Sequence, residues 1–79
     1  MKEDGFNSAD IRQGECLWVL SVSGEGAVRL FDLGFFSGAR IRCVGIAPFG
    51  DPVMITVGGR VVALRRRDLA YVSAAQEEK

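Results

Sequence analysis

The stretch Val53-Met-Ile-Thr-Val-Gly-Gly-Arg-Val-Val-Ala-Leu64 decides the fold class of this 79-residue chain. β-Branched residues occupy every second position of Val53–Val57, which is the period of a strand with one buried face. Gly58-Gly59 predicts a two-residue turn of the primed type, and Arg60–Leu64 then returns as the partner strand. Because an isolated hairpin is not stable in water, the neighbouring segments must supply more strands.

Three further segments are predicted to be strands. Cys16–Val22 is rich in β-branched and aromatic residues and is apolar on both sides, so we expect a central strand with Trp18 in the core. Ala39–Ile46 alternates apolar residues with arginine or glycine, as a half-exposed strand does. Ala70–Ser73 is expected to form a last short strand.

Three segments are predicted to be short helices or single helical turns. The first is Asn7–Arg12 and the last is Arg65–Leu69. Between them, Ala27–Leu33 has the i, i+3, i+4 apolar spacing of a helix, and Gly34 stands where a left-handed residue would end it. The expected buried stripe of this middle helix consists of Ala27, Leu30, Phe31 and Leu33.

The order of these elements predicts one small domain. Short strands bury their edges best by curling into a barrel. We therefore expect a mainly β, SH3-like small barrel of about five strands, with a short helical insertion after the first strand. Residues 8–73 should form this domain, with residues 1–7 as a disordered lead-in and residues 74–79 as a frayed tail.

The composition excludes several classes of function. With 48% hydrophobic and 25% charged residues, the chain is typical of a globular domain. It contains no histidine, the commonest general base, and no catalytic set is visible, so we expect no enzymatic activity. No apolar run approaches the roughly eighteen residues of a membrane span, and no signal peptide opens the chain. We therefore expect a cytoplasmic protein that does not insert into a membrane.

The candidate ligand-binding residues are few. The two cysteines, Cys16 and Cys43, are far apart in the sequence and are expected to be reduced, buried and structural. Their spacing does not make a tetrahedral metal site, so we expect neither a bound metal nor a cofactor. Gly24 and Gly26 precede a predicted helix but lack the rest of a phosphate-binding motif, and we interpret both as turn glycines.

The charge is unevenly placed although the net charge is zero. Residues 29–67 carry seven arginines against Asp32 and Asp51, a net charge of +5 that includes Arg65-Arg66-Arg67. Such a cluster suits phosphates, so a small barrel that binds nucleic acid through its arginine-rich middle is an alternative. RNA-binding barrels usually also expose aromatic rings on which bases stack, and here Tyr71 is a solitary candidate for such a platform. Our first expectation is therefore no nucleic-acid partner.

Apolar residues at exposed positions favour a protein partner. Phe35 and Phe36 follow the predicted helix directly, and two adjacent residues cannot easily both point inward. One is expected to fill the barrel and the other to contact solvent or a partner. Phe49 lies at a predicted loop tip and Met54 on an outward strand face. Because apolar residues beside arginines suit protein recognition, the candidate partner contacts are Phe35, Phe36, Phe49, Met54, Arg65 and Arg66.

Three segments, in this order, resemble the FeoA family. Leu30-Phe-Asp-Leu-Gly-Phe-Phe-Ser-Gly-Ala-Arg-Ile41 is similar to its Leu-x-x-Leu-Gly-(apolar)-x-x-Gly-x-x-(apolar) pattern. Ala47-Pro-Phe-Gly-Asp-Pro52 resembles its Ala-Pro-(apolar)-Gly-Asp-Pro loop, and Val62–Arg65 followed by Asp68–Ala70 resembles its closing segment. The resemblance covers residues 8–73, and the matching positions are Leu30, Leu33, Gly34, Gly38, Pro48, Gly50, Asp51, Pro52, Leu64 and Ala70.

This resemblance implies a small cytosolic barrel that assists FeoB, the membrane protein that imports ferrous iron and carries a cytosolic GTP-binding domain. FeoA proteins are thought to dock on FeoB and modulate it, so FeoB is the expected partner. Whether modulation acts on GTP hydrolysis, assembly or gating is left open. Two alternatives stay open beside the nucleic-acid-binding barrel: a metal-binding iron carrier or sensor, and a weak homodimer.

Overall fold

The computed structural model of the protein describes residues 6–76 and contains the predicted hairpin. Strands β4 (Val53–Val57) and β5 (Arg60–Leu64) pair antiparallel, with Val57 opposite Arg60. Gly58 and Gly59 between them have φ angles of 60° and 84°, which a side chain rarely tolerates. The primed turn predicted from the sequence is consistent with these angles.

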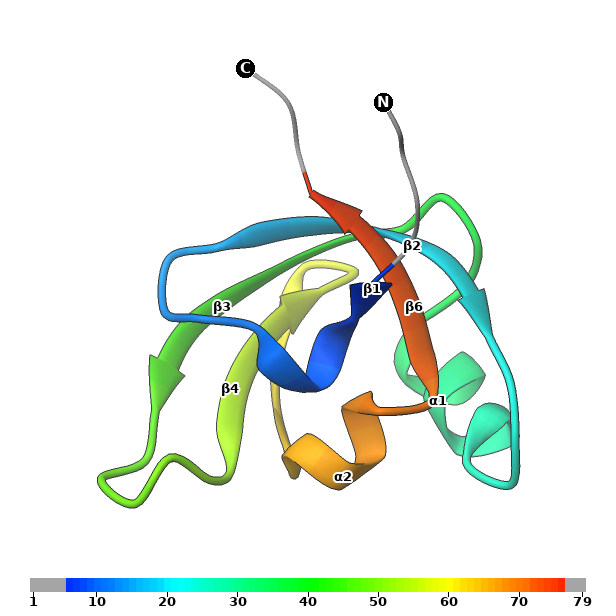
Figure 1. Ribbon diagram of the computed structural model, residues 1–79. Coiled ribbons are helices and arrows are strands. Elements are labelled where there is room, and N and C mark those ends of the chain that lie inside the picture. The colour runs from blue at the N-terminus through cyan, green and yellow to red at the C-terminus, as the bar shows by residue number, and fades with distance from the viewer. Residues whose placement is uncertain (1–5, 77–79) are drawn as a thin grey trace.

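The remaining strands extend this hairpin into one curled antiparallel sheet (Figure 1). The strand order is β1-β6-β2-β3-β4-β5. The prediction of a mainly β, SH3-like fold is therefore confirmed, with five strands of five to seven residues and a sixth of two residues. The added strands are β1 (Phe6–Asn7), β2 (Cys16–Val22), β3 (Arg40–Ile46) and β6 (Val72–Gln76).

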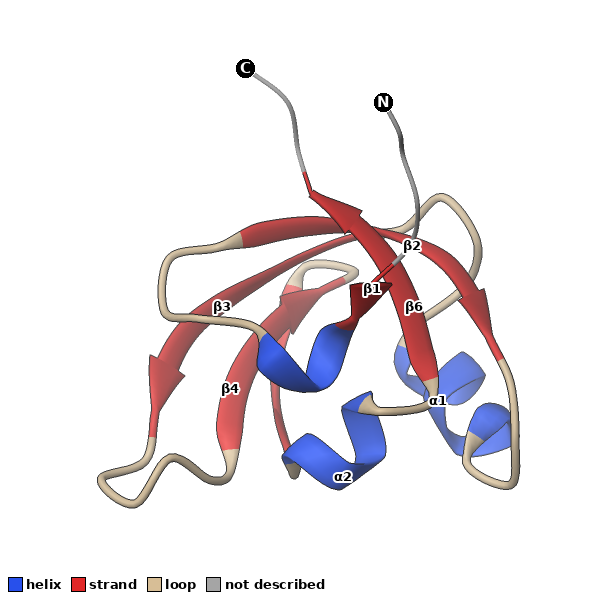
Figure 2. Cartoon of the chain, viewed as in Figure 1, coloured by secondary structure: helices blue, strands red, loops and turns tan. Residues whose placement is uncertain are grey.

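Three short helical segments connect the strands (Figure 2). Helix α1 (Ala27–Leu33) follows β2, as predicted, and ends at Gly34, whose φ of 107° is left-handed. The amide of Gly34 donates to the last carbonyls of the helix, which is how a left-handed C-terminal residue stops a helix. The others are the 3-10 turn η1 (Ser8–Asp10) and α2 (Arg66–Leu69).

The core lies inside the curled sheet and is closed by one phenylalanine. The inward residues of β4, including Ile55, are buried as the alternation predicted. Phe35 is fully buried, whereas its neighbour Phe36 is 55% exposed. This confirms that one of the two rings fills the barrel and the other lies outside it.

The structure corrects three expectations about burial. Trp18 is not in the core, because Leu17 and Val19 on either side of it point inward and its own ring, 40% exposed, faces outward. An apolar run hides this alternation in the sequence. Phe31 is half exposed rather than part of the buried stripe of α1. Cys43 is buried as expected, but Cys16 lies on the outer face and is only partly buried.

Two segments near the ends of the described chain are also more ordered than predicted. The expected tail does not begin at Ala74, because β6 continues to Gln76 by pairing with β2. The expected lead-in is wrong for Phe6–Asn7, which pair with Ala74 and Ser73 of β6. Residues 1–5 and 77–79 lie outside the described part of the chain. No helix within residues 6–76 has the length and apolar character needed to cross a membrane.

Candidate partner-binding surface

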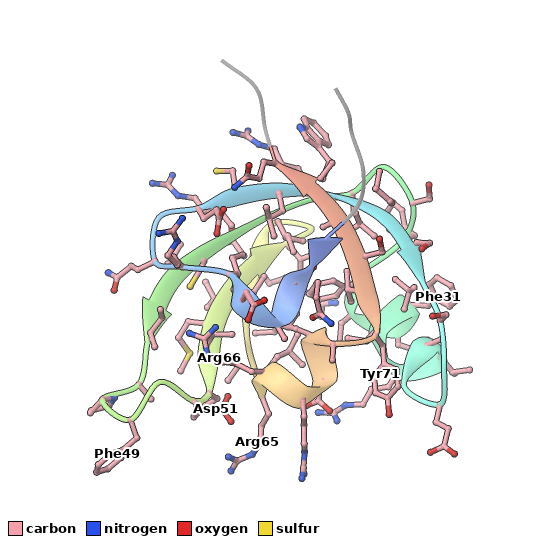
Figure 3. All side chains as sticks on the ribbon, in the orientation of Figure 1. Phe31, Phe49, Asp51, Arg65, Arg66 and Tyr71 are labelled. Carbon is pink, nitrogen blue, oxygen red and sulfur yellow. The ribbon has the colours of Figure 1, made fainter. Side chains whose placement is uncertain are left out.

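The structure brings three of the six predicted contact residues together and separates the others. Phe49, Arg65 and Arg66 come from a loop and a helix that lie side by side, with Asp51 between them (Figure 3). Phe36 follows α1, which lies on the other side of the molecule from this loop (Figure 1). Met54 is half-buried on the outward face of β4.

Phe35 must be removed from the contact candidates. Its side chain has no exposed surface and belongs to the hydrophobic core. The sequence could not distinguish Phe35 from Phe36, because the two are identical and adjacent. Only the direction in which the chain leaves α1 decides which ring turns inward.

The loop Ala47–Pro52 is closed by its own backbone. The amide of Gly50 donates to the Ala47 carbonyl at 2.7 Å, and the amide of Ala47 donates to the Pro52 carbonyl at 3.0 Å. Gly50 has a φ of 92°, so this position needs glycine. The Asp51–Pro52 peptide bond is cis. The two backbone hydrogen bonds fold the loop back on itself and leave its tip outside.

Asp51 joins the loop to α2. Its Oδ1 accepts a 2.8 Å hydrogen bond from the backbone amide of Arg66, the first residue of the helix. The first amides of a helix have no partner within it, and Arg65, the capping residue, supplies no side-chain bond. Asp51 therefore caps α2 from a distant part of the sequence. Its other oxygen lies 3.7 Å from Nη1 of Arg65.

Arg66 holds three segments together. Its Nε donates to the Gly50 carbonyl at 2.6 Å, and its Nη1 donates to the carbonyls of Ala9 and Ile11 at 2.8 and 2.9 Å. Arg66 follows the edge strand β5, and Ala9 and Ile11 follow the other edge strand, β1, so the bonds to these two carbonyls link the two edges of the curled sheet, a junction that we call the seam. Arg66 is thus mainly a structural residue here, because its Nε and Nη1 already donate to carbonyls within the chain, and its contact with a partner stays a prediction.

Phe49 and Arg65 are left to face solvent. Phe49 is 99% exposed at the tip of the loop, and the side chain of Arg65, at the start of α2, is 57% exposed. Figure 3 shows both pointing away from the body of the molecule. We name these two residues, together with the exposed Arg67 of α2, the Phe49 surface.

A second surface, missed by the sequence reasoning, lies on the outer face of the sheet. The guanidinium of Arg40 sits over the Trp18 ring, 5.9 Å from its centroid, and its Nη2 is 3.8 Å from Sγ of Cys16. An open groove of about 260 Å³ runs beside them, with Arg42 and Thr56 in its lining. No local pattern marks this face in the sequence, because Trp18 stands in a continuous apolar run.

The glycines before α1 have a packing role. Tyr71 places its ring against the turn, and a Cβ on Gly24 would lie 2.5 Å from Cδ1 of that ring. A Cβ on Gly26 would lie 3.0 Å from Cδ2 of the same ring. Gly24 has a φ of 85°, in agreement with the interpretation of these residues as turn glycines.

A metal centre finds no support in the described residues. Nowhere within residues 6–76 do three histidine, cysteine, aspartate or glutamate side chains come together. Cys16 and Cys43 are both free thiols on neighbouring strands, one partly exposed on the outer face and one inside the core.

The chain matches the FeoA domain over residues 9–75. No curated protein sequence matches it. The FeoA protein of Chlorobium tepidum has a similar structure, with a TM-score of 0.82 and 29% identity over 92% of this chain and 71% of that one. The FeoA of Stenotrophomonas maltophilia is described as a prokaryotic SH3-domain protein and was solved with zinc. Its TM-score is 0.80 and its sequence identity 28%, over 92% of this chain and 96% of that one.

The same fold occurs in a second setting. A manganese-dependent transcriptional repressor has a TM-score of 0.79 at 13% identity, over 92% of this chain and 42% of that one, which shows a common fold alone. The FeoA match, by contrast, spans nearly all of the described residues and agrees with the three sequence motifs. The chain therefore belongs to the FeoA family, a family of ferrous iron transport accessory proteins.

Proposed function

We propose that this chain is a non-enzymatic, cytoplasmic accessory protein that binds the ferrous iron transporter FeoB and modulates its activity. The observation that carries this proposal is the FeoA match over residues 9–75. The Phe49 surface supports a binding role, because it offers an apolar ring and exposed arginines, residue types enriched at protein interfaces.

The test is to delete the gene for this chain in its own organism and to measure ferrous iron uptake. We expect uptake to fall and to be restored by the wild-type chain. Strains lacking FeoB provide the control, because deletion of the chain should change nothing there. Unchanged uptake in the single deletion, at limiting ferrous iron, would contradict the proposal.

One observation favours a second candidate, single-stranded nucleic acid bound at the outer sheet face. Trp18 is exposed and carries Arg40 over its ring, and Arg42 lines the same groove. An aromatic ring beside cations is a platform on which a base can stack. Titration of oligonucleotides at low salt, followed by the fluorescence of the single tryptophan, tests this candidate. Binding that weakens steeply with added salt supports it, and an unchanged signal at low salt eliminates it.

A further inference from the structure

Phe49 is the most exposed of the large hydrophobic residues in the described chain. An exposed phenylalanine on a mobile loop tip would need no explanation. This loop, however, is bonded at both of the residues that follow Phe49: the Gly50 carbonyl accepts from Arg66 Nε, and Asp51 Oδ1 accepts from the Arg66 amide. The amide of Gly50 is also bonded, to the Ala47 carbonyl.

These bonds hold the backbone of the loop in place. A loop that is already held loses little conformational entropy when a partner covers its tip, whereas a mobile loop loses much more. Its burial would remove a nearly complete phenyl surface from water, which is the main favourable contribution of an interface anchor. The arrangement therefore favours an anchor residue over an accidental exposure.

The charges on the loop and on the adjoining α2 segment indicate what the partner surface around the pocket must carry. Ala47–Pro52 and Arg65–Leu69 together hold three arginines and two aspartates, a net charge of +1. Arg66 turns its guanidinium inward, so the cations that remain at the surface are Arg65 and Arg67. Carboxylates on the rim of the partner pocket would complement them.

Two other occupants fit less well. A second copy of this chain would have to receive Phe49 in its own groove, but that groove is lined by Arg40 and Arg42 and would oppose Arg65. A lipid surface would gain little from one phenylalanine and a net charge of +1, because each basic residue contributes only about 1 kcal/mol near an anionic membrane.

We infer that Phe49 is an anchor that enters an apolar pocket of FeoB, with carboxylates on the pocket rim facing Arg65 and Arg67. This inference rests on the proposed function and specifies the part of this chain that performs it. Arg66 and Asp51 hold the loop in its binding conformation and stay out of the interface.

The experiment measures the affinity of the full chain for FeoB from the same genome in lipid nanodiscs. Phe49→Ala is compared with Phe36→Ala, which removes the same ring from an exposed position elsewhere. We expect F49A to weaken binding at least tenfold, F36A to stay within twofold of wild type, and both to melt within a few degrees of it. The double change R65E/R67E should also weaken binding, by an amount that falls as salt is added.

The outcomes separate the inference from the proposed function. If the wild-type chain binds FeoB and F49A binds it equally well, the inference is overturned and the proposed function stands. Wild type that does not bind FeoB overturns both. Equal binding to nanodiscs without FeoB would identify a lipid occupant, and self-association lost in F49A would identify a second copy; either result overturns the assignment to a FeoB pocket.

A gain-of-signal measurement complements the loss of affinity. Replacement of Phe49 by the photoreactive p-benzoylphenylalanine keeps the aromatic anchor and allows crosslinking on illumination. We expect a FeoB crosslink from position 49 and much less from position 36. Mapping should place the crosslink beside carboxylate residues of FeoB. Crosslinking from position 36 alone would contradict the inference.

Discussion

The backbone amide of Arg66 donates a 2.8 Å hydrogen bond to Oδ1 of Asp51, fifteen residues earlier in the chain. The same arginine donates a second bond to this loop, at 2.6 Å, from its Nε to the carbonyl of Gly50. These two bonds tie the Ala47–Pro52 loop to the start of α2, and two further bonds from Arg66 tie both to the segment around η1. The stability of the barrel seam and the position of Phe49 thus depend on the same few contacts.

Asp51→Ala should lower the free energy of unfolding by about 1–2 kcal/mol, because α2 loses its cap and the loop loses an anchor. Asp51→Asn keeps an oxygen that can accept from the Arg66 amide and loses only the exposed ion pair with Arg65, which contributes about 0–1 kcal/mol. D51N should therefore be the milder change. Urea unfolding measures both, and a D51A protein as stable as wild type would rule out the capping role.

Arg66→Ala should lower the free energy of unfolding by about 2–4 kcal/mol, because it leaves three carbonyls without the charged donor that now bonds to them. Arg66→Lys should lower the free energy of unfolding by an amount between zero and the loss in Arg66→Ala, since an ammonium group cannot reproduce the planar fork that reaches Gly50 and η1 together. The matched control is Arg67→Ala at an exposed neighbouring position, expected to stay within about 0.5 kcal/mol of wild type. Equal losses in R66A and R67A, measured by chemical denaturation, would contradict the assignment.

Gly24→Ala tests the contact between Tyr71 and the turn before α1. Gly14→Ala is its control, because Gly14 has nearly the same φ, 86° against 85°, but nothing within 4 Å of an added Cβ. Gly14→Ala should lower the free energy of unfolding by about 1 kcal/mol because of backbone strain alone. Gly24→Ala should lower it by about 2 kcal/mol, because the added Cβ also displaces the Tyr71 ring. In a Tyr71→Ala background the difference between the two should disappear. A difference that persists without the ring would assign the cost to the backbone alone.

Phe35→Ala should destabilise the domain by about 3–5 kcal/mol, the usual cost of deleting a buried phenyl ring. In a domain of this size such a loss removes most of the stability, so a large unfolded fraction is expected at 25 °C. Phe36→Ala should cost less than about 1 kcal/mol, because its ring is mainly exposed. Thermal unfolding followed by circular dichroism distinguishes them, and the reverse order would show that the wrong ring was placed in the core.

Local patterns in the sequence predicted most of the fold. The period of two in Val53–Val57, the Gly58-Gly59 turn and the helical spacing of Ala27–Leu33 all led to the observed elements with the observed bounds. The prediction failed where an apolar run hid the alternation of a strand and where pairing with a distant strand extended an element. Trp18 was misplaced because its strand is apolar on both faces, and the end of β6 was missed because pairing with β2 stabilises Ala74–Gln76.

The candidate surface was predicted only in part. The sequence selects Phe49 because it lies at a predicted loop tip and Arg65 because it belongs to a basic cluster, and both side chains are exposed. Arg66 belongs to the same run of three arginines, so no local pattern distinguishes it from Arg65 or Arg67. Its inward position follows from a helical turn that points it at carbonyls of the loop and of the segment around η1, which lie up to 57 residues away in the sequence.

The sequence by itself determined most of the secondary structure, the turn positions and the family, since these depend on short-range periodicity, on glycines at positive φ and on motif order. Only the tertiary structure decided which of two adjacent phenylalanines is buried, and which arginine of three braces the seam. The reason is physical: those choices depend on partners distant in sequence, and identical side chains acquire different roles only when the sheet curls and brings such partners within bonding distance.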